Sequence, residues 1–216
     1  MTSSFAPFRQ WAALPNLAVL HTETTGFRGQ VIELALIDAQ GQTLFLERIR
    51  PTCPVESGAQ IFHGISDADL AELPTIEHHW PRLAELLSVH QVVIYNAQFN
   101  VEAISRTLDA VMPAGWEYPD EEQDVPSFSA AYFPFHQFAS VAGCVMNAYA
   151  PIYDNRASFL NHQKPAKFAV ACEREKVETS NLLGINTALG SAMRTLRLVQ
   201  AVAARGDDRQ VEVVWQ

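Results

Sequence analysis

Three strand patterns in close succession constrain the fold of this chain more than any other feature. Apolar residues run from Leu17 to Leu20, alternate with polar residues from Val31 to Ala39, and return from Thr43 to Pro51. Only short turns separate the three patterns, at Gly26–Gln30 and Ala39–Gln42. Connections this short join antiparallel neighbours, because a parallel crossover needs about a dozen residues or more. This part of the chain therefore predicts a three-stranded antiparallel meander.

After Pro51 the period of the apolar residues changes from that of strands to that of helices. Ser66, followed by Asp67 and Asp69, is typical of a helix start, and Pro74-Thr75 begins another helix. The second of these helices has apolar positions at Ile76, Trp80, Leu83, Leu86 and Leu87. The other expected elements are helix 67–73, strand 92–97, helix 99–111, and helices at about 144–153, 165–176 and 187–204. This order predicts an α/β fold with a mixed central sheet, in which three antiparallel strands precede helix-strand-helix units, flanked by helices.

Residues 113–140 interrupt this pattern with prolines, acidic residues and aromatic residues. We interpret them as an insertion or long loop within a single domain that spans residues 1–216. A fifth strand is expected at about Phe138–Ala142, with Trp116–Tyr118 as an alternative. The tail Val211–Trp215 has the pattern of a late strand or of an edge that binds a partner.

Composition excludes several classes of function. A formal net charge of -9 argues against a protein that coats nucleic acid by neutralising phosphates, although a local basic groove stays compatible with it. The three cysteines are widely spaced and form no CxxC pair, which argues against a disulfide framework or zinc knuckle and favours a reducing compartment. There is no signal-peptide pattern and no apolar run of ~18–20 residues, so we expect a cytoplasmic protein without a membrane span.

The end of the first predicted strand carries two polar side chains that could serve chemistry. His21 and Glu23 are two residues apart, so a strand directs them to the same face. A histidine with a carboxylate suits Zn²⁺ or Mn²⁺, but a third ligand is needed and none stands in register. A buried hydrogen-bonded histidine is the plainer interpretation of His21.

Four segments together resemble one family, the DEDDh 3′–5′ exonucleases of the ribonuclease H-like superfamily. The segments are "LAVLHTETTG" (17–26), "IFHGIS" (61–66), "VIYNAQFN" (93–100) and "INTALGSA" (185–192). Their order and spacing agree with that family over about Leu17–Ala204. The resemblance implies a site in which four carboxylates hold two Mg²⁺ or Mn²⁺ ions and a histidine acts as general base.

The same resemblance indicates that most of those functional residues are replaced here. Glu23 is retained, while the other family positions hold His21, Asn100, Asn186 and Ser191. One carboxylate remains where the family has four, and an asparagine cannot take a proton from water.

The resemblance also implies a set of substrate-binding positions. These are Thr24, Thr25, His63, Asn96 and Phe99. Each has a plainer alternative: Thr25 as a turn residue, Asn96 as a tie between a strand end and a loop, and Phe99 as part of the core.

Our leading hypothesis is a pseudo-exonuclease that needs no cofactor. It would bind a single-stranded nucleic-acid 3′ end or nucleotide, or act as an interaction subunit or homodimer. The alternative is a divergent active enzyme that uses Mg²⁺ or Mn²⁺, with ligands drawn from Asp109, Asp120, Glu121, Glu122, Asp124 or Asp154.

Two further groups of residues bear on this choice. The insertion aromatics would cover the vacated cleft, dock a partner or pack a satellite core; they are Phe128, Tyr132, Phe133, Phe135 and Phe138. Basic residues beside an open cleft would favour strand binding; the candidates are Arg106, Arg156, Lys164, Lys167 and Arg194.

Overall fold

A mixed sheet forms the centre of the computed structural model, which describes residues 4–111, 135, 137–153, 164–179, 184 and 186–205. The strands in these residues are β1 (Leu17–Thr24), β2 (Val31–Asp38), β3 (Thr43–Arg48), β4 (Gln91–Ile94) and β5 (Gly143–Cys144). Their order across the sheet is β3-β2-β1-β4-β5. β1, β2 and β3 are antiparallel neighbours, whereas β4 runs parallel to β1 and β5 parallel to β4. The predicted α/β fold with a mixed sheet is confirmed.

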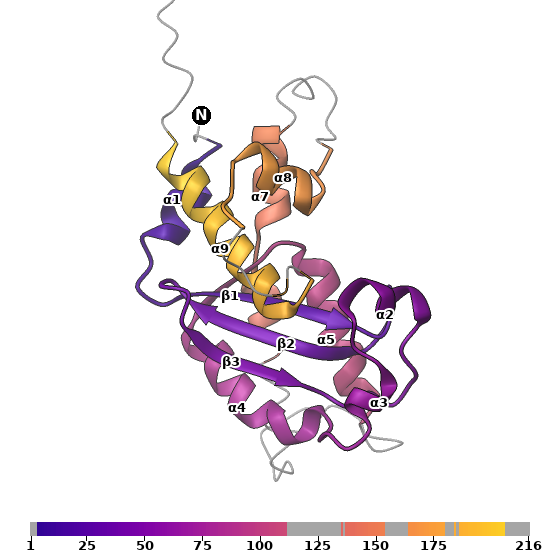
Figure 1. Ribbon diagram of the computed structural model, residues 1–216. Coiled ribbons are helices and arrows are strands. Elements are labelled where there is room, and N and C mark those ends of the chain that lie inside the picture. Colours follow the sequence, from indigo (N-terminus) through magenta and orange to yellow (C-terminus); the bar gives the residue numbers. More distant parts are fainter. Residues whose placement is uncertain are drawn as a thin grey trace, which may run out of the picture.

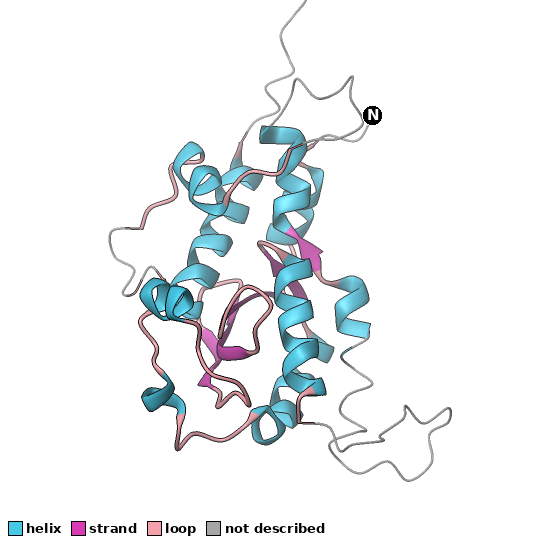
Figure 2. Ribbon diagram, turned by 90° about the vertical axis from the view of Figure 1, so that its right-hand side faces the viewer, coloured by secondary structure: helices cyan, strands magenta, loops and turns pink. Residues whose placement is uncertain are grey.

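Helices cover both faces of this sheet (Figures 1 and 2). The helices within the described residues are α1 (Ala6–Ala12), α2 (Ser57–His63), α3 (Asp67–Leu70), α4 (Ile76–Val89), α5 (Ala97–Asp109), α7 (Val145–Tyr153), α8 (Phe168–Arg174) and α9 (Ala188–Ala204). α4 and α5 pack on one face of the sheet, whereas α1, α7 and α9 pack on the other. No helix in this described part of the chain is both long and apolar enough to cross a membrane.

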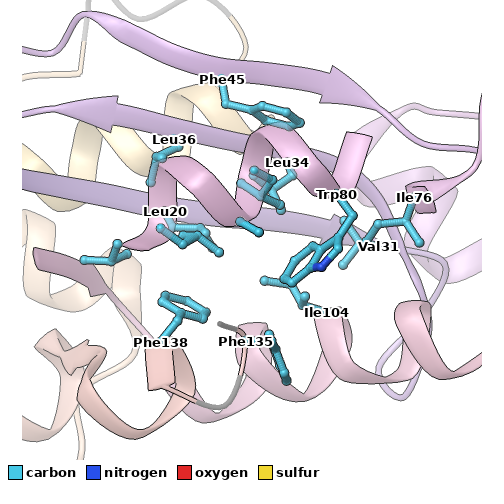
Figure 3. Packing of buried hydrophobic residues seen from close by; sticks show 14 of the residues in the cluster. Leu20, Val31, Leu34, Leu36, Phe45, Ile76, Trp80, Ile104, Phe135 and Phe138 are labelled. Carbon is cyan, nitrogen blue, oxygen red and sulfur yellow. The ribbon is translucent and has the colours of Figure 1, made fainter. Parts of the chain in front are cut away.

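The two helical layers create two apolar cores, one on each face of the sheet. Because neighbouring strand residues point to opposite faces, Ala18 and Leu20 enter the core with α4 and α5, and Leu17 and Val19 enter the core with α9. β2 lies between the same two cores, so it is apolar on both faces. Figure 3 shows strand residues packed against Trp80 of α4 in the first core.

Most predicted helices are found within a few residues of their expected bounds. The capping box of α3 is present, because the Ser66 side chain accepts a hydrogen bond from the Asp69 backbone N–H while the Asp69 carboxylate accepts one from the Ser66 backbone N–H. α1 and α2 were not predicted. α2 has no buried residue, and its Ile61 and Phe62 side chains are exposed, so no apolar period marks it.

The fifth strand was predicted at the wrong place. Residues 137–141 are helical, and the strand is the short β5 that follows. The Ala142 backbone N–H donates to the Phe138 carbonyl at 2.9 Å, the helical spacing. Phe135 and Phe138 lie three residues apart and point into the core beside Trp80 (Figure 3), so a helix and not a strand buries them. The alternative strand at Trp116–Tyr118 lies outside the described residues.

The predicted insertion at 113–140 is described only at its C-terminal end. There Phe135 and Phe138 belong to the main core rather than to the cleft or a satellite core. Phe128, Tyr132, Phe133 and the tail Val211–Trp215 lie outside the described residues.

Candidate functional site: a cleft at the ends of β1 and β4

A cavity of about 750 Å³ opens at the carboxyl ends of β1 and β4. Those ends meet at one edge of the sheet because the two strands are parallel. Residues of β1, α2, α5, α9 and the segment that leads into α8 line it. The sequence-predicted residues that line it are His21, Glu23, Thr24, His63, Asn96, Phe99, Asn100 and Ser191. Thr25 and Asn186 do not line it; Thr25 is buried and Asn186 is exposed.

His21 and Glu23 lie side by side on β1, as their spacing predicted. The His21 Nε2 and Glu23 Oε1 atoms are 3.8 Å apart. Burial raises the pKa of Glu23 to about 8, and the Glu33 carboxylate on β2 adds to this shift while Arg194 opposes it. Burial, assisted by Arg194, lowers the pKa of His21 to about 4. Both side chains are therefore mainly neutral at pH 7.

The Asn100 amide connects α5 to β1. Its Oδ1 accepts hydrogen bonds from the backbone N–H and the hydroxyl of Thr22, both at 2.9 Å. Its Nδ2 donates to the Asn96 carbonyl at 2.8 Å. The amide oxygen is thus already bonded twice within the protein, which makes Asn100 a buried structural link at this position.

Arg194 occupies the α9 side of the cavity, one helical turn after Ser191. It donates to the Ser191 Oγ at 3.0 Å, and its Cζ lies 4.7 Å from the centroid of the Phe168 ring. The Phe168 ring also packs against Tyr95, with ring centroids 4.4 Å apart, and stacks on His21, with ring centroids 6.4 Å apart. A guanidinium over an aromatic face is held by a cation–π interaction. Ser191 therefore accepts a hydrogen bond from a cation at this edge of the cavity.

Several predicted binding residues support the loops around the cavity. The Thr24 hydroxyl donates to the Gly26 carbonyl at 2.8 Å, and the Thr25 hydroxyl accepts from the Gln30 N–H at 3.0 Å. Thr25 therefore stabilises the turn that follows β1.

His63 and Asn96 also make hydrogen bonds to the backbone. The His63 Nδ1 accepts from the Ile65 N–H at 3.1 Å, so its Nε2 carries the proton and donates to the Thr24 carbonyl at 3.2 Å. Burial lowers the pKa of His63, which keeps this ring neutral. The Asn96 side chain caps α5 by accepting from the Phe99 N–H.

Aromatic side chains that the sequence analysis did not assign to the site form one rim of the cavity. Phe27 is 80% exposed and Phe62 is 59% exposed, yet both line it. Phe27 packs on Phe99 with ring centroids 6.0 Å apart. These two side chains place exposed apolar surface at the mouth of the cavity. The only sequence signal for Phe27 was its place directly after the first motif, within the turn Gly26–Gln30.

The described residues do not fit a two-metal centre. Among them, no group of three or more histidine, cysteine, aspartate and glutamate side chains is placed to hold a metal ion. Mg²⁺ and Mn²⁺ need several anionic oxygens, whereas Glu23 shares this part of the cavity with the positive charge of Arg194. A Zn²⁺ or Mn²⁺ site built on His21 and Glu23 likewise has no third ligand in the described residues.

The residues proposed as migrated ligands are mostly not described. Asp109 is exposed near the end of α5 and accepts from the Ser105 hydroxyl at 3.4 Å, away from the cavity lining. Asp120, Glu121, Glu122, Asp124 and Asp154 lie outside the described residues.

Sheet order, flanking helices and the cleft at the strand ends define a ribonuclease H-like exonuclease fold. The chain belongs to the exonuclease family (RNase_T), whose sequence model matches residues 19–140, more than half of the 216 residues. It is 32% identical over 90 residues to an uncharacterized exonuclease, CP81, of Escherichia phage 186; the match covers 41% of this chain and 46% of the phage protein. The chain thus spans less than half the length of that relative.

Two solved structures of low sequence identity, both named exonucleases, share this fold. Exonuclease X, in complex with 5′ overhanging duplex DNA, is 17% identical with a TM-score of 0.52, over 86% of this chain and 90% of that one. Exonuclease I is 14% identical with a TM-score of 0.61, over 88% of this chain and 41% of that one. These likenesses confirm the predicted fold.

Proposed function

We propose that this domain is a degenerate 3′–5′ exonuclease that has lost two-metal hydrolysis and binds a single-stranded nucleic-acid 3′ end or a nucleotide in the same cleft. The observation that supports the proposal most is the set of hydrogen bonds made by the residues that replace the family's carboxylates. Asn100 is bonded to Thr22 and Asn96, and Ser191 accepts from Arg194. Neither side chain supplies the negative charge that a divalent ion requires.

The residue at the position of the family's general base also lies away from the described lining of the cavity. Asn186, which replaces the family histidine, is exposed and does not line the cavity. A neutral amide takes no proton from water, and removal of a general base alone lowers rates by ~10²- to 10⁴-fold. Loss of the metal pair removes further electrostatic stabilisation of the transition state. Together these changes support a domain that does not hydrolyse phosphodiesters.

The cleft keeps features suited to binding. Its volume of about 750 Å³ is that of a ligand site, and aromatic side chains line it. Of the basic residues that we named as a discriminator, Arg194 and Lys167 line it, whereas Arg106 and Lys164 do not; Arg156 lies outside the described residues. The related fold of exonuclease X is found with DNA bound. An open cleft with basic side chains favours strand binding over a purely structural role.

The competing function is an active metal-dependent exonuclease on DNA or RNA, and membership of an exonuclease family favours it. It would require Glu23 as a metal ligand, together with carboxylates from outside the described residues. A protein-interaction subunit, with or without a homodimer, would leave the cleft without a nucleotide ligand.

Calorimetric titration of Mn²⁺ into the full chain, with and without a short single-stranded oligonucleotide, tests the proposal beside a sensitive nuclease assay. We expect no specific Mn²⁺ binding, no shortening of the strand, and oligonucleotide binding in EDTA. The matched variants are Glu23→Ala and Glu85→Ala, since Glu85 is an exposed carboxylate on α4 away from the cavity. Degradation from the 3′ end that Glu23→Ala abolishes and Glu85→Ala leaves intact would refute the loss of catalysis. Absence of any oligonucleotide or nucleotide binding would favour the interaction subunit.

A further inference from the structure

The chemistry of the cleft points to a particular part of a nucleotide. Arg194 lines the cavity from α9, and Lys167 lines it from the segment before α8, so two separate elements bring cations to one cavity. Two contacts fix the position of the Arg194 guanidinium. Its Cζ lies 4.7 Å from the centroid of the Phe168 ring, and its Nη2 donates to the Ser191 Oγ at 3.0 Å. An arginine that is already ordered loses less entropy when it binds an anion.

Within the described residues, three carboxyl groups lie on this cavity or beside it. Glu23 lines the cavity from β1 and interacts electrostatically with Arg194. Glu33 lies next to Glu23 on β2, but its carboxylate accepts from the Arg48 Nε and from the Ala188 N–H. Glu56 lines the cavity on the opposite side, at the start of α2, and is exposed.

The aromatic rim supplies a place for a base. Phe27, Phe62 and Phe99 line the same cavity as Arg194. An aromatic side chain can stack on any nucleobase, because every base has a π-face. The net charge of -9 disfavours a long phosphate track, because each extra phosphate would approach an acidic protein.

We propose that Arg194, assisted by Lys167, takes the place of the divalent metals of this fold and binds the phosphate of a single nucleotide, whose base packs on the phenylalanine rim. This proposal rests on the proposed function and narrows it. The ligand is one phosphate with one base, whether it comes as a free nucleotide or as the last nucleotide of a strand. Binding then needs no metal, and its affinity depends weakly on salt, since only one or two charges are neutralised.

The test measures affinity in EDTA by calorimetry for adenosine and uridine monophosphates, and by fluorescence anisotropy for a labelled single-stranded octamer with a 3′-phosphate or a 3′-hydroxyl. Arg194→Gln should weaken binding by about 10- to 100-fold, the range for a lost hydrogen-bonded charge. Arg194→Lys keeps the charge and should recover most of the affinity. Arg197→Gln is the matched control, because Arg197 lies on the same helix but does not line the cavity.

Lys167→Gln provides a second variant that does not depend on packing, since Lys167 is exposed. We expect it to weaken binding about threefold, as for the loss of an exposed charge contact. Thermal unfolding of every variant identifies losses that come from misfolding. Binding of the monophosphates that falls in Arg194→Gln assigns the free nucleotide; a fall seen only with the octamer assigns the strand end.

Two results would overturn this inference. If Arg194→Gln, Lys167→Gln and the unaltered protein bind with equal affinity, these two cations do not bind the phosphate, although the proposed binding of a strand end is unaffected. If binding appears only with Mn²⁺, a metal ion binds the phosphate instead of Arg194. Metal-dependent shortening of the octamer is a separate outcome that refutes the proposed loss of catalysis, whatever the Arg194 variants do.

Discussion

Replacement of the buried Glu23 by glutamine should make the protein more stable at alkaline pH. The pKa of this carboxyl group rises on folding from 4.5 to about 8, chiefly through burial and then through the nearby Glu33 charge. The unfolded chain releases the proton at a lower pH than the folded protein does. Unfolding is therefore accompanied by proton release between these two pH values, and the free energy of unfolding falls as the pH rises through them.

The size of the effect follows from the width of that interval. Each pH unit within it is worth about 1.36 kcal/mol, so the ionisation of Glu23 destabilises the folded state by on the order of 4 kcal/mol at pH 9 relative to pH 5. A small domain has only ~5–15 kcal/mol of stability in total. Glu23→Gln has no group to ionise and should lose this part of the pH dependence.

Urea denaturation, followed by tryptophan fluorescence at intervals from pH 5 to pH 9, measures the difference. The stability advantage of Glu23→Gln over the unaltered protein should grow with pH and level off above pH 8. Glu56→Gln is the control, because Glu56 is an exposed carboxylate on the same cavity. If the Glu23→Gln and unaltered curves stay parallel over this range, the assignment of a buried, protonated Glu23 is wrong.

Three further changes test the contacts around the site and the core. Asn100→Leu leaves the buried Thr22 N–H without its acceptor and should lower the free energy of unfolding by about 1–3 kcal/mol in urea titrations. Glu33→Gln removes the negative charge at the N-terminus of α9, where the Ala188 N–H donates at 2.8 Å, and should cost about 1–2 kcal/mol in the same assay. Phe138→Ala empties part of a core site that is 3% exposed and should cost about 3–5 kcal/mol, measured by calorimetric or urea unfolding.

Each of these changes has a control with a similar substitution at a less buried residue. The control for Asn100→Leu is Gln98→Leu, because Gln98 is exposed on α5. The control for Glu33→Gln is Glu47→Gln on β3, and the control for Phe138→Ala is Val141→Ala, because Val141 is 62% exposed in the same helical stretch. These three should each change stability by about 0.5 kcal/mol or less. A core role for Phe138 would be contradicted if its loss cost no more than that of Val141.

The long periodic elements could be predicted from the sequence because their buried faces repeat within a few residues. The spacing of Ile76, Trp80, Leu83 and Leu87 marks α4 by itself. The prediction of a strand at Phe138–Ala142 was wrong because no such repeated pattern marks β5. β5 has only the two residues Gly143–Cys144, and its place depends on pairing with β4 across the sheet.

The sequence by itself determined the fold and the residues that stand where the resemblance places the family's catalytic positions. Strand and helix periods specify the layers, and the parallel pairing of β1 and β4 then brings Glu23, Asn96 and Asn100 to one edge. Only the tertiary structure decided what those side chains do. The Asn100 oxygen is bonded to Thr22, and Arg194 lies between Phe168 and Ser191. Such contacts depend on how helices far apart in the chain pack against the sheet, and burial in that packed interior, not the local sequence, sets the protonation of Glu23.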